Sequence, residues 1–170
     1  STTLDTACAL TRTVRDAVLA HEILAARRVT RSPAALSAWR LAVPRQTFLD
    51  GLDPAVESAF ERTLDTLRHA SAHIEAIDLP QVSDLAGIQA TGGFSAAESY
   101  AWHRTLLARE GSRYDPRVRA RIERGAAMAA FEYIDLLRAR ARWIAGVEAA
   151  IAGYDALLSP TVPILAPPIA

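Results

Sequence analysis

The sequence predicts an α/β fold that is rich in helices and contains a few short strands. Apolar residues recur at helical spacing over most of the second half of the 170 residues. In the first half, two short apolar segments, Arg40–Pro44 and His73–Leu79, flank a helical pattern and are typical of buried strands. The length of 170 residues suits one domain, and a composition of 51% apolar and 22% charged residues excludes intrinsic disorder.

The first half is predicted to hold two helices. One covers about residues 13–26, where Thr13 and Asp16 have capping-box spacing. After a loop at Ser32-Pro33, a second helix starts at Asp53-Pro54, with aspartate at the cap and proline in the first turn, and runs to about Ala72. Strand, helix and strand at this spacing predict one parallel crossover unit.

The second half is predicted to be almost entirely helical. After a short helix over residues 84–90, Gly92-Gly93 interrupts the helical pattern. Ser95 and Glu98 then form a capping box for a helix that ends near Arg109.

Two further helices and a third strand complete the prediction. Asp115-Pro116 starts a helix that ends near Gly125, and a long helix then continues to about Ala152. Ala156–Ser159 is a third apolar strand, and the prolines after it exclude further regular structure. We expect the three strands to lie side by side.

Composition excludes several kinds of protein. Nineteen basic and nineteen acidic residues cancel, so nucleic acid and anionic membrane are not expected partners. No apolar run approaches the roughly 18 residues of a membrane span, and we expect a cytoplasmic, bacterial protein. All nineteen basic residues are arginine, so this chain supplies no Schiff-base lysine, serine–lysine dyad or phosphate-loop lysine.

Candidate metal ligands and nucleophiles are few. Asp65, His69 and His73 have the spacing of one helix face, but the helix ends near this point and surface histidines are the favoured interpretation, with no metal or cofactor expected. Cys8 precedes a helix, where a thiolate is stabilised, yet a small buried apolar residue is the favoured interpretation. His21 and His103 have no partner that the sequence identifies.

Arginine is concentrated in two helical stretches. The favoured interpretation is a solvated face paired with Glu123, Glu132 and Asp135. The alternative is that one arginine turns inward and binds a carboxylate, for which its planar fork is suited. The arginines concerned are Arg117, Arg119, Arg121, Arg124, Arg138, Arg140 and Arg142.

Segments along the whole chain resemble motifs of the amidase signature family. Members of this family hydrolyse or transfer amides and include the amidotransferase subunit that charges tRNA with glutamine. The last segment is similar to the family pattern Y-D-x-L-L-x-P-T-x-P and is the most specific. The segments are Ser1–Asp5 with Leu10–Ala17, Arg40–Pro44, Ile77–Pro80, Ala97-Glu98, Tyr114–Gly125 and Tyr154–Pro163.

The resemblance implies that the strands belong to the mixed sheet of an amidase. It also implies a catalytic lysine, a bridging serine and a nucleophilic serine in a glycine-rich loop, and none of these occurs in this chain. We therefore expect residues 1–170 to be a single domain or a fragment of an amidase domain that lacks the N-terminal catalytic part and the C-terminal end. Such a fragment forms core and one wall of the substrate pocket and is inactive by itself.

The resemblance also implies substrate-binding residues and a partner. Arg121 matches a position that in some members helps to hold the polar end of the substrate, a small-molecule amide, and Pro160 and Thr161 match a loop near the pocket. A surface ion pair is the alternative for Arg121. For the chain as a whole the alternative is a helical interaction module without enzymatic activity.

A fragment of this kind is expected to self-associate through an uncovered apolar face. The residues expected nearest that face are Leu4, Leu41, Val43, Leu157, Ile164 and Leu165.

Overall fold

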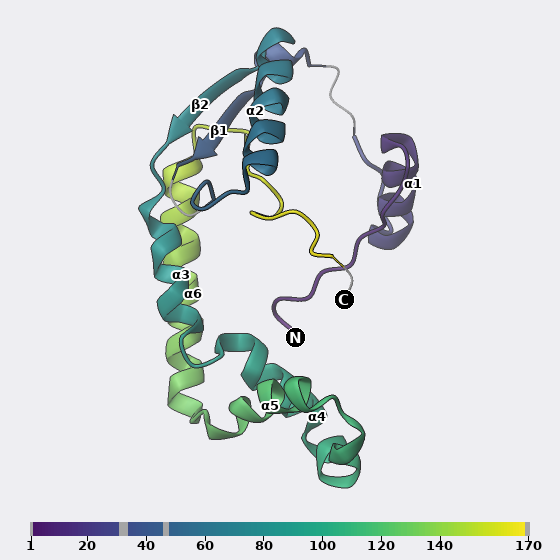
Figure 1. Ribbon diagram of the computed structural model, residues 1–170, viewed down its shortest axis with the longest axis vertical. Helices are drawn as coiled ribbons and strands as arrows, with labels where there is room; N and C mark the ends of the chain where they lie inside the picture. Colours follow the sequence, from purple (N-terminus) through teal and green to yellow (C-terminus); the bar gives the residue numbers. More distant parts are fainter. Residues whose placement is uncertain (1, 31–33, 46–47, 169–170) are drawn as a thin grey trace. The chain divides into compact units, whose positions relative to one another are not determined.

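The three predicted strands form one parallel sheet in the computed structural model (Figure 1). β1 (Arg40–Pro44) lies in the centre, between β2 (His73–Ile77) and β3 (Ala156–Leu157). Leu41 of β1 pairs with Ile74 of β2 and with Ala156 of β3. The predicted arrangement of the strands and the parallel crossover unit are confirmed, although β2 and β3 each end two residues before the predicted limit.

The structure describes residues 2–30, 34–45 and 48–168, which fall into two units. The first unit, Ser1–Pro33, contains α1 (Val14–Ala25). The predicted cap is present, because Thr13 Oγ1 accepts a hydrogen bond from the Asp16 amide at 3.1 Å. None of the residues of α1 is buried, and the predicted Ser32-Pro33 loop lies outside the described residues.

The second unit, Ala34–Ala170, begins with a 3₁₀ turn (Leu36–Ala38) and the first crossover. α2 (Pro54–His69) is capped by Asp53 Oδ1, which accepts from the Ala55 amide at 2.8 Å. It ends three residues before the predicted Ala72, because the chain turns at Ser71, whose φ is +71°.

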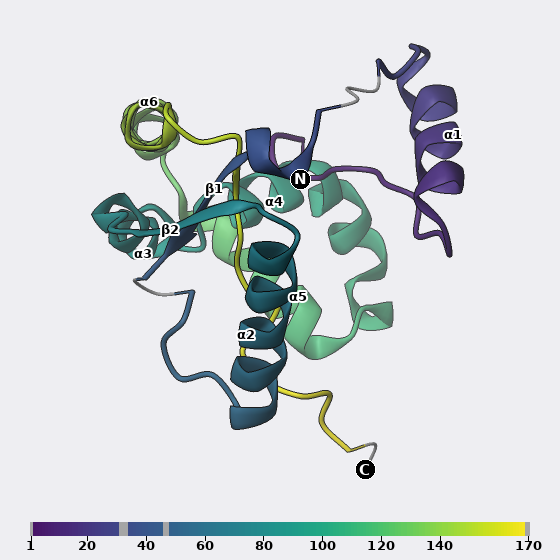
Figure 2. The same ribbon diagram turned by 90° about the horizontal axis from the view of Figure 1, so that it is seen from above.

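A pair of neighbouring helices follows β2. A 3₁₀ turn (Pro80–Ser83) leads into α3 (Asp84–Gln89), which lies beside α6 (Ala130–Ile151) in both views (Figures 1 and 2). The indole Nε1–H of Trp143 on α6 donates to the carbonyl oxygen of Gln81 at 2.7 Å. This bond ties the long helix to the segment that leaves the sheet. No described helix combines the length and the apolar character that crossing a membrane requires.

α4 (Gly93–Glu110) and α5 (Pro116–Glu123) follow, with 3₁₀ turns at Gly111–Arg113 and Arg124–Ala127. The first of the two arginine-rich stretches, called the arginine cluster below, runs from Arg117 to Arg124 in this part of the unit. The predicted Ser95–Glu98 capping box is wrong: α4 begins at Gly93, its cap position is Gly92, three residues before Ser95, and no side chain caps it. Gly92 has φ +91°, a conformation that glycine adopts without strain, and this ends the preceding helical segment as predicted.

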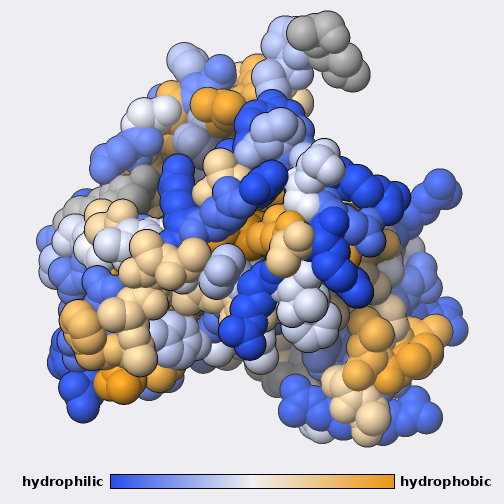
Figure 3. All heavy atoms as spheres, turned by 90° about the horizontal axis from the view of Figure 1, so that it is seen from below, coloured by the Kyte–Doolittle hydropathy of each residue, from blue (hydrophilic) through white to orange (hydrophobic). Residues whose placement is uncertain are grey.

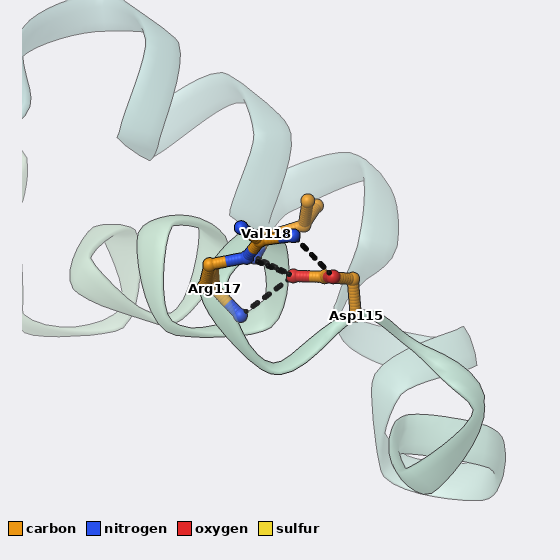
Figure 4. A network of polar contacts seen from close by, with 3 residues as sticks. All are labelled: Asp115, Arg117 and Val118. Atoms are coloured by element: carbon orange, nitrogen blue, oxygen red, sulfur yellow. Dashed lines mark hydrogen bonds and ion pairs between the residues drawn. The ribbon is translucent and has the colours of Figure 1, made fainter. Parts of the chain in front are cut away.

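The predicted start of α5 is confirmed. The Asp115 carboxylate accepts from the amides of Arg117 at 2.8 Å and Val118 at 3.3 Å (Figure 4). Pro116 occupies the first helical position, where its missing N–H costs nothing.

The prediction of an uncovered apolar face is wrong for two strand residues. Leu41 and Val43 are only 8% and 5% exposed, because β1 is the central strand and is covered by its neighbours. Leu4, Ile164 and Leu165 are exposed, and Leu157 is half-buried. On the face drawn in Figure 3, apolar residues are exposed in several separate groups among hydrophilic side chains.

Candidate functional site

Arg121 lines a small pocket between α4 and α5. Its volume is about 190 Å³. The other lining residues are Gly92, Ser95, Ala96, Ser99, Ile122 and Arg124. The lining thus includes two arginines, both of them exposed, and two serines.

The motif around Arg121 packs α5 directly against the backbone of α4. Ile122 is buried at 7% exposure. A Cβ atom at Gly125 would lie 2.1 Å from the carbonyl oxygen of Ala96, so only glycine fits there. A Cβ atom at Gly92 would lie 2.7 Å from Cβ of Ala96. At these two glycines the segments on the two sides of the pocket are in direct contact.

The predicted pairing of the arginine cluster holds for only part of it. Arg117 pairs with Asp115 at 3.1 Å, and Arg119 Nε pairs with Glu123 at 2.7 Å. Within residues 2–30, 34–45 and 48–168, the side chains of Arg121 and Arg124 form no ion pair or hydrogen bond. Surface ion pairs are therefore formed by Arg117 and Arg119, and not by Arg121, for which such a pair was the alternative.

The arginines of this cluster lower the pKa of the neighbouring Asp115 carboxyl group. The hydrogen bond from the Arg117 guanidinium lowers the pKa of Asp115 most, followed by the amides of Arg117 and Val118. The positive charge of Arg121 lowers it further. The positive charges of Arg117 and Arg121 thus favour the ionised form of the Asp115 carboxylate.

Pro160 and Thr161 lie at a different site from Arg121. They line a groove of about 540 Å³ between α2 and the proline-rich segment, and this groove shares no lining residue with the Arg121 pocket. The Asp53 amide donates to the Pro163 carbonyl at 2.8 Å, which fixes the segment beside the start of α2. The opposite wall is formed by α2 residues that are apolar except for one threonine: Ala55, Val56, Ala59, Phe60, Thr63 and Leu64.

The sequence pattern Asp65, His69 and His73 forms no metal site. His69 is the last residue of α2, and its Nδ1 lies 2.7 Å from the Asp65 carbonyl oxygen. His73 belongs to β2 and does not continue the helix face. No cluster of three potential metal ligands occurs in the described part of the chain.

Two other candidates differ from expectation. Cys8 is exposed, so the interpretation as a buried apolar residue is wrong. His103, for which the sequence identified no partner, has Nδ1 2.8 Å from Tyr114 Oη, with the two rings edge to face.

Sequence analysis missed a tyrosine–glutamate pair on α4 and α6. Tyr133 Oη donates to Glu98 Oε1 at 3.1 Å, beside a pocket of about 520 Å³ that Arg104 and Met128 also line. Burial, and then the hydrogen bond to Glu98, raise the pKa of Tyr133. Only the Ala97-Glu98 motif marks this place in the sequence, because the two partners lie 35 positions apart.

The groove between α3 and α6 is larger, at about 910 Å³. Charges of both signs line it, from Asp84, Asp135 and Arg142 among others. The buried Oε1 of Gln81 at its edge has no hydrogen-bond partner in the described residues.

Comparison with known proteins identifies the family. The amidase family profile matches residues 1–170. The chain belongs to the amidase family. The resemblance that the sequence motifs indicated is thereby confirmed.

Individual relatives agree with this membership. The chain is 31% identical over its whole length to 2-amino-5-chloromuconic acid deaminase of Comamonas testosteroni, covering 37% of that protein. It is 31% identical to an amidase of Pseudomonas putida, over 74% of this chain and 26% of that protein. An amidase crystal structure superposes with a TM-score of 0.81 at 29% identity, over 94% of this chain and 36% of the other. The amidase-family chain thus spans about a third of the length of these relatives.

Proposed function

We propose that the protein to which this chain belongs breaks the C–N bond of a carboxamide. The amine leaves with a proton, and the acyl group passes to water or to another acceptor. The observation that carries this proposal is the match to the amidase family over all 170 residues, together with the TM-score of 0.81 to an amidase. The deaminase relative is likewise named for removing an amino group from an acid.

Within that protein, this chain contributes core and one wall of the substrate pocket rather than the reacting groups. The chain has no lysine, so a lysine that activates a serine has to come from elsewhere in the protein. The chain spans only about a third of its relatives, which leaves room for such a part. By itself the chain is then inactive.

Arg121 is the substrate-binding residue in this proposal. Arg121 is exposed, forms no ion pair or hydrogen bond among the described residues, and lines a small pocket together with Ser95 and Ser99. A guanidinium binds carboxylate or carbonyl oxygens with a fixed, planar geometry. Pro160 and Thr161 contribute at a separate place, where they shape the groove against α2.

The test compares the full reading frame with the 170-residue chain. We expect the full protein to release ammonia from simple amides and to be labelled by a fluorophosphonate serine probe, whereas the chain by itself does neither. A full protein without turnover or labelling would favour the alternative of a helical interaction module. Turnover by the purified chain alone would contradict the role assigned to it.

A further inference from the structure

α6 is apolar on two sides, and one of them is exposed to solvent. The residues on the inner side are half-buried, where the helix contacts α3 and α4: Tyr133, Leu136, Ala139 and Trp143. The outer side carries exposed apolar residues at intervals of three and four positions, which keep them on one face of the helix for about 21 Å. We call this face the α6 stripe, and its members are Phe131, Ile134, Leu137, Ala141, Ile144 and Ala145. Phe131 is 68% exposed, and a continuous apolar surface of this kind marks an interaction site.

The α6 stripe is complementary in shape to a reversed copy of itself. Phe131 and Ile134 lie in the first half of α6, whereas Ala141 and Ala145 lie in the second half. A second α6 that ran antiparallel to the first, with its centre near Arg138, would place each Phe131 over the partner's Ala145 and each Ile134 over the partner's Ala141. Large side chains would then fill the space above small ones. A parallel copy would instead set Phe131 against Phe131 and alanine against alanine.

Charges along one edge of the α6 stripe favour the same antiparallel arrangement. Asp135, Arg138 and Arg142 follow one another at intervals of three and four positions, so they share this edge. Asp135 pairs with Arg138 at 3.2 Å, and Arg142 forms no ion pair or hydrogen bond within residues 2–30, 34–45 and 48–168. A twofold axis perpendicular to both helices brings this edge of the two copies together in opposite directions. Each Arg142 then lies beside the partner's Asp135.

The end of α6 is complementary in charge as well. Glu148 is exposed and lies one turn beyond Ile144 on the side of the α6 stripe. In the antiparallel arrangement its carboxylate lies beside the N-terminal end of the partner's α6, where the helix dipole is positive. These charged contacts lie at the solvent-exposed rim, so they set the direction of the partner helix and add little to the affinity, which comes from the apolar residues.

We propose that the α6 stripe is the interface of a homodimer, in which a second copy of this chain packs its α6 antiparallel to the first. Complementarity of the stripe with its own reversed copy, in shape and in charge, is the reason for choosing a second copy over another partner. This proposal goes beyond the proposed amidase function and does not depend on it.

The test measures the oligomeric state of the full-length protein by analytical ultracentrifugation, and we expect a dimer. Phe131→Glu places a carboxylate in the interface twice per dimer and should raise the Kd of the dimer roughly a hundredfold. Val118→Glu is the matched control, because Val118 is also exposed in the first turn of a helix, α5, and this variant should keep the wild-type Kd. A monomeric wild type, or a Phe131→Glu variant with the wild-type Kd, overturns the proposal.

A charge exchange tests the antiparallel direction with substitutions that are all on the surface. Arg142→Asp sets two carboxylates against each other across the interface and should raise the Kd roughly tenfold. Adding Asp135→Arg to this variant restores opposite charges across the axis and, within each helix, keeps an acidic partner for Arg138. The double variant should therefore recover the wild-type Kd. No effect of Arg142→Asp, or no recovery in the double variant, overturns the antiparallel arrangement.

Discussion

Arg40 and Asp155, which lie 115 positions apart, are joined by two reciprocal hydrogen bonds. The Arg40 amide donates to Asp155 Oδ2 at 2.7 Å, and the Asp155 amide donates to the Arg40 carbonyl at 2.8 Å. The Arg40 guanidinium also lies over the Tyr154 ring, 5.2 Å from its centre. The Tyr154-Asp155 pair of the family motif thus fixes the short strand β3 to the central strand β1.

Replacing Asp155 should therefore destabilise the sheet. Asp155→Ala removes the acceptor of the Arg40 amide, and we expect a loss of about 1 kcal/mol in the free energy of unfolding, because the bond is accessible to solvent. Urea unfolding of the full-length protein measures this. Asp135→Ala, which breaks only a surface ion pair with Arg138, is the control and should change stability little. Equal stability of the two variants would contradict the role of Asp155.

Gly125 should be intolerant of any side chain. Gly125→Ala would place a methyl group 2.1 Å from the Ala96 carbonyl oxygen, so α4 and the 3₁₀ turn that contains Gly125 must move apart at a cost of about 1–3 kcal/mol. The matched control is Gly87→Ala on α3, where a Cβ atom meets nothing within 4 Å. Because alanine is the better helix former, this control should be neutral or stabilising by about 0.5–1 kcal/mol. The Tm values of the two variants test this, and a Gly125→Ala variant as stable as Gly87→Ala would contradict the prediction.

Arg121 should affect substrate binding more than folding. If it holds a carboxylate or carbonyl, Arg121→Ala loses a charge-assisted hydrogen bond of roughly 1.5–3 kcal/mol, which is about 10- to 150-fold in kcat/KM. The loss should appear mainly in KM, and Arg121→Lys should restore activity only partly. Arg119→Ala is the control, since Arg119 is paired with Glu123. A fall in Tm with unchanged KM would instead assign Arg121 a structural role.

Asp115 should make the start of α5 sensitive to acid. Its pKa is lowered from the ordinary 3.8, chiefly by the Arg117 hydrogen bond. The charged carboxylate therefore contributes stability that is fully present above the ordinary pKa and is lost as the pH falls through the lowered value. Asp115→Asn can still cap the helix but has no charge. We expect the wild type to be more stable than this variant near neutral pH and the difference to shrink in acid, as measured by denaturant unfolding across a pH series.

The isolated chain should self-associate at micromolar concentration. α1 has no buried residue, and its Val14, Ile23 and Leu24 are more than half exposed. Analytical ultracentrifugation of the 170-residue chain checks this, and a monomer at all concentrations would contradict it. Replacing Ile23 and Leu24 by glutamine should shift the equilibrium toward monomer.

The sequence by itself determined the elements whose ends are set by nearby residues. Asp53-Pro54 and Asp115-Pro116 start helices as predicted, because each aspartate caps amides only two or three residues ahead. The strand Arg40–Pro44 and the first residue of β2 were also predicted from local patterns, here from short apolar segments. The family motifs are also local patterns, so the amidase family is evident from them without knowledge of the tertiary contacts.

Only the tertiary structure decided where these elements meet and what they place together. The turn at Ser71 puts His73 on a strand instead of on the helix of His69, and the Arg40–Asp155 pair makes a strand of only two residues part of the sheet. The approach of Gly125 to Ala96, 29 positions away, leaves Arg121 and Arg124 at one pocket while Arg117 and Arg119 find acidic partners. Such contacts join distant parts of the chain through packing and backbone geometry. The spacing of residue types along the sequence does not predict these contacts, because it indicates only which residues share a face within one helix or strand.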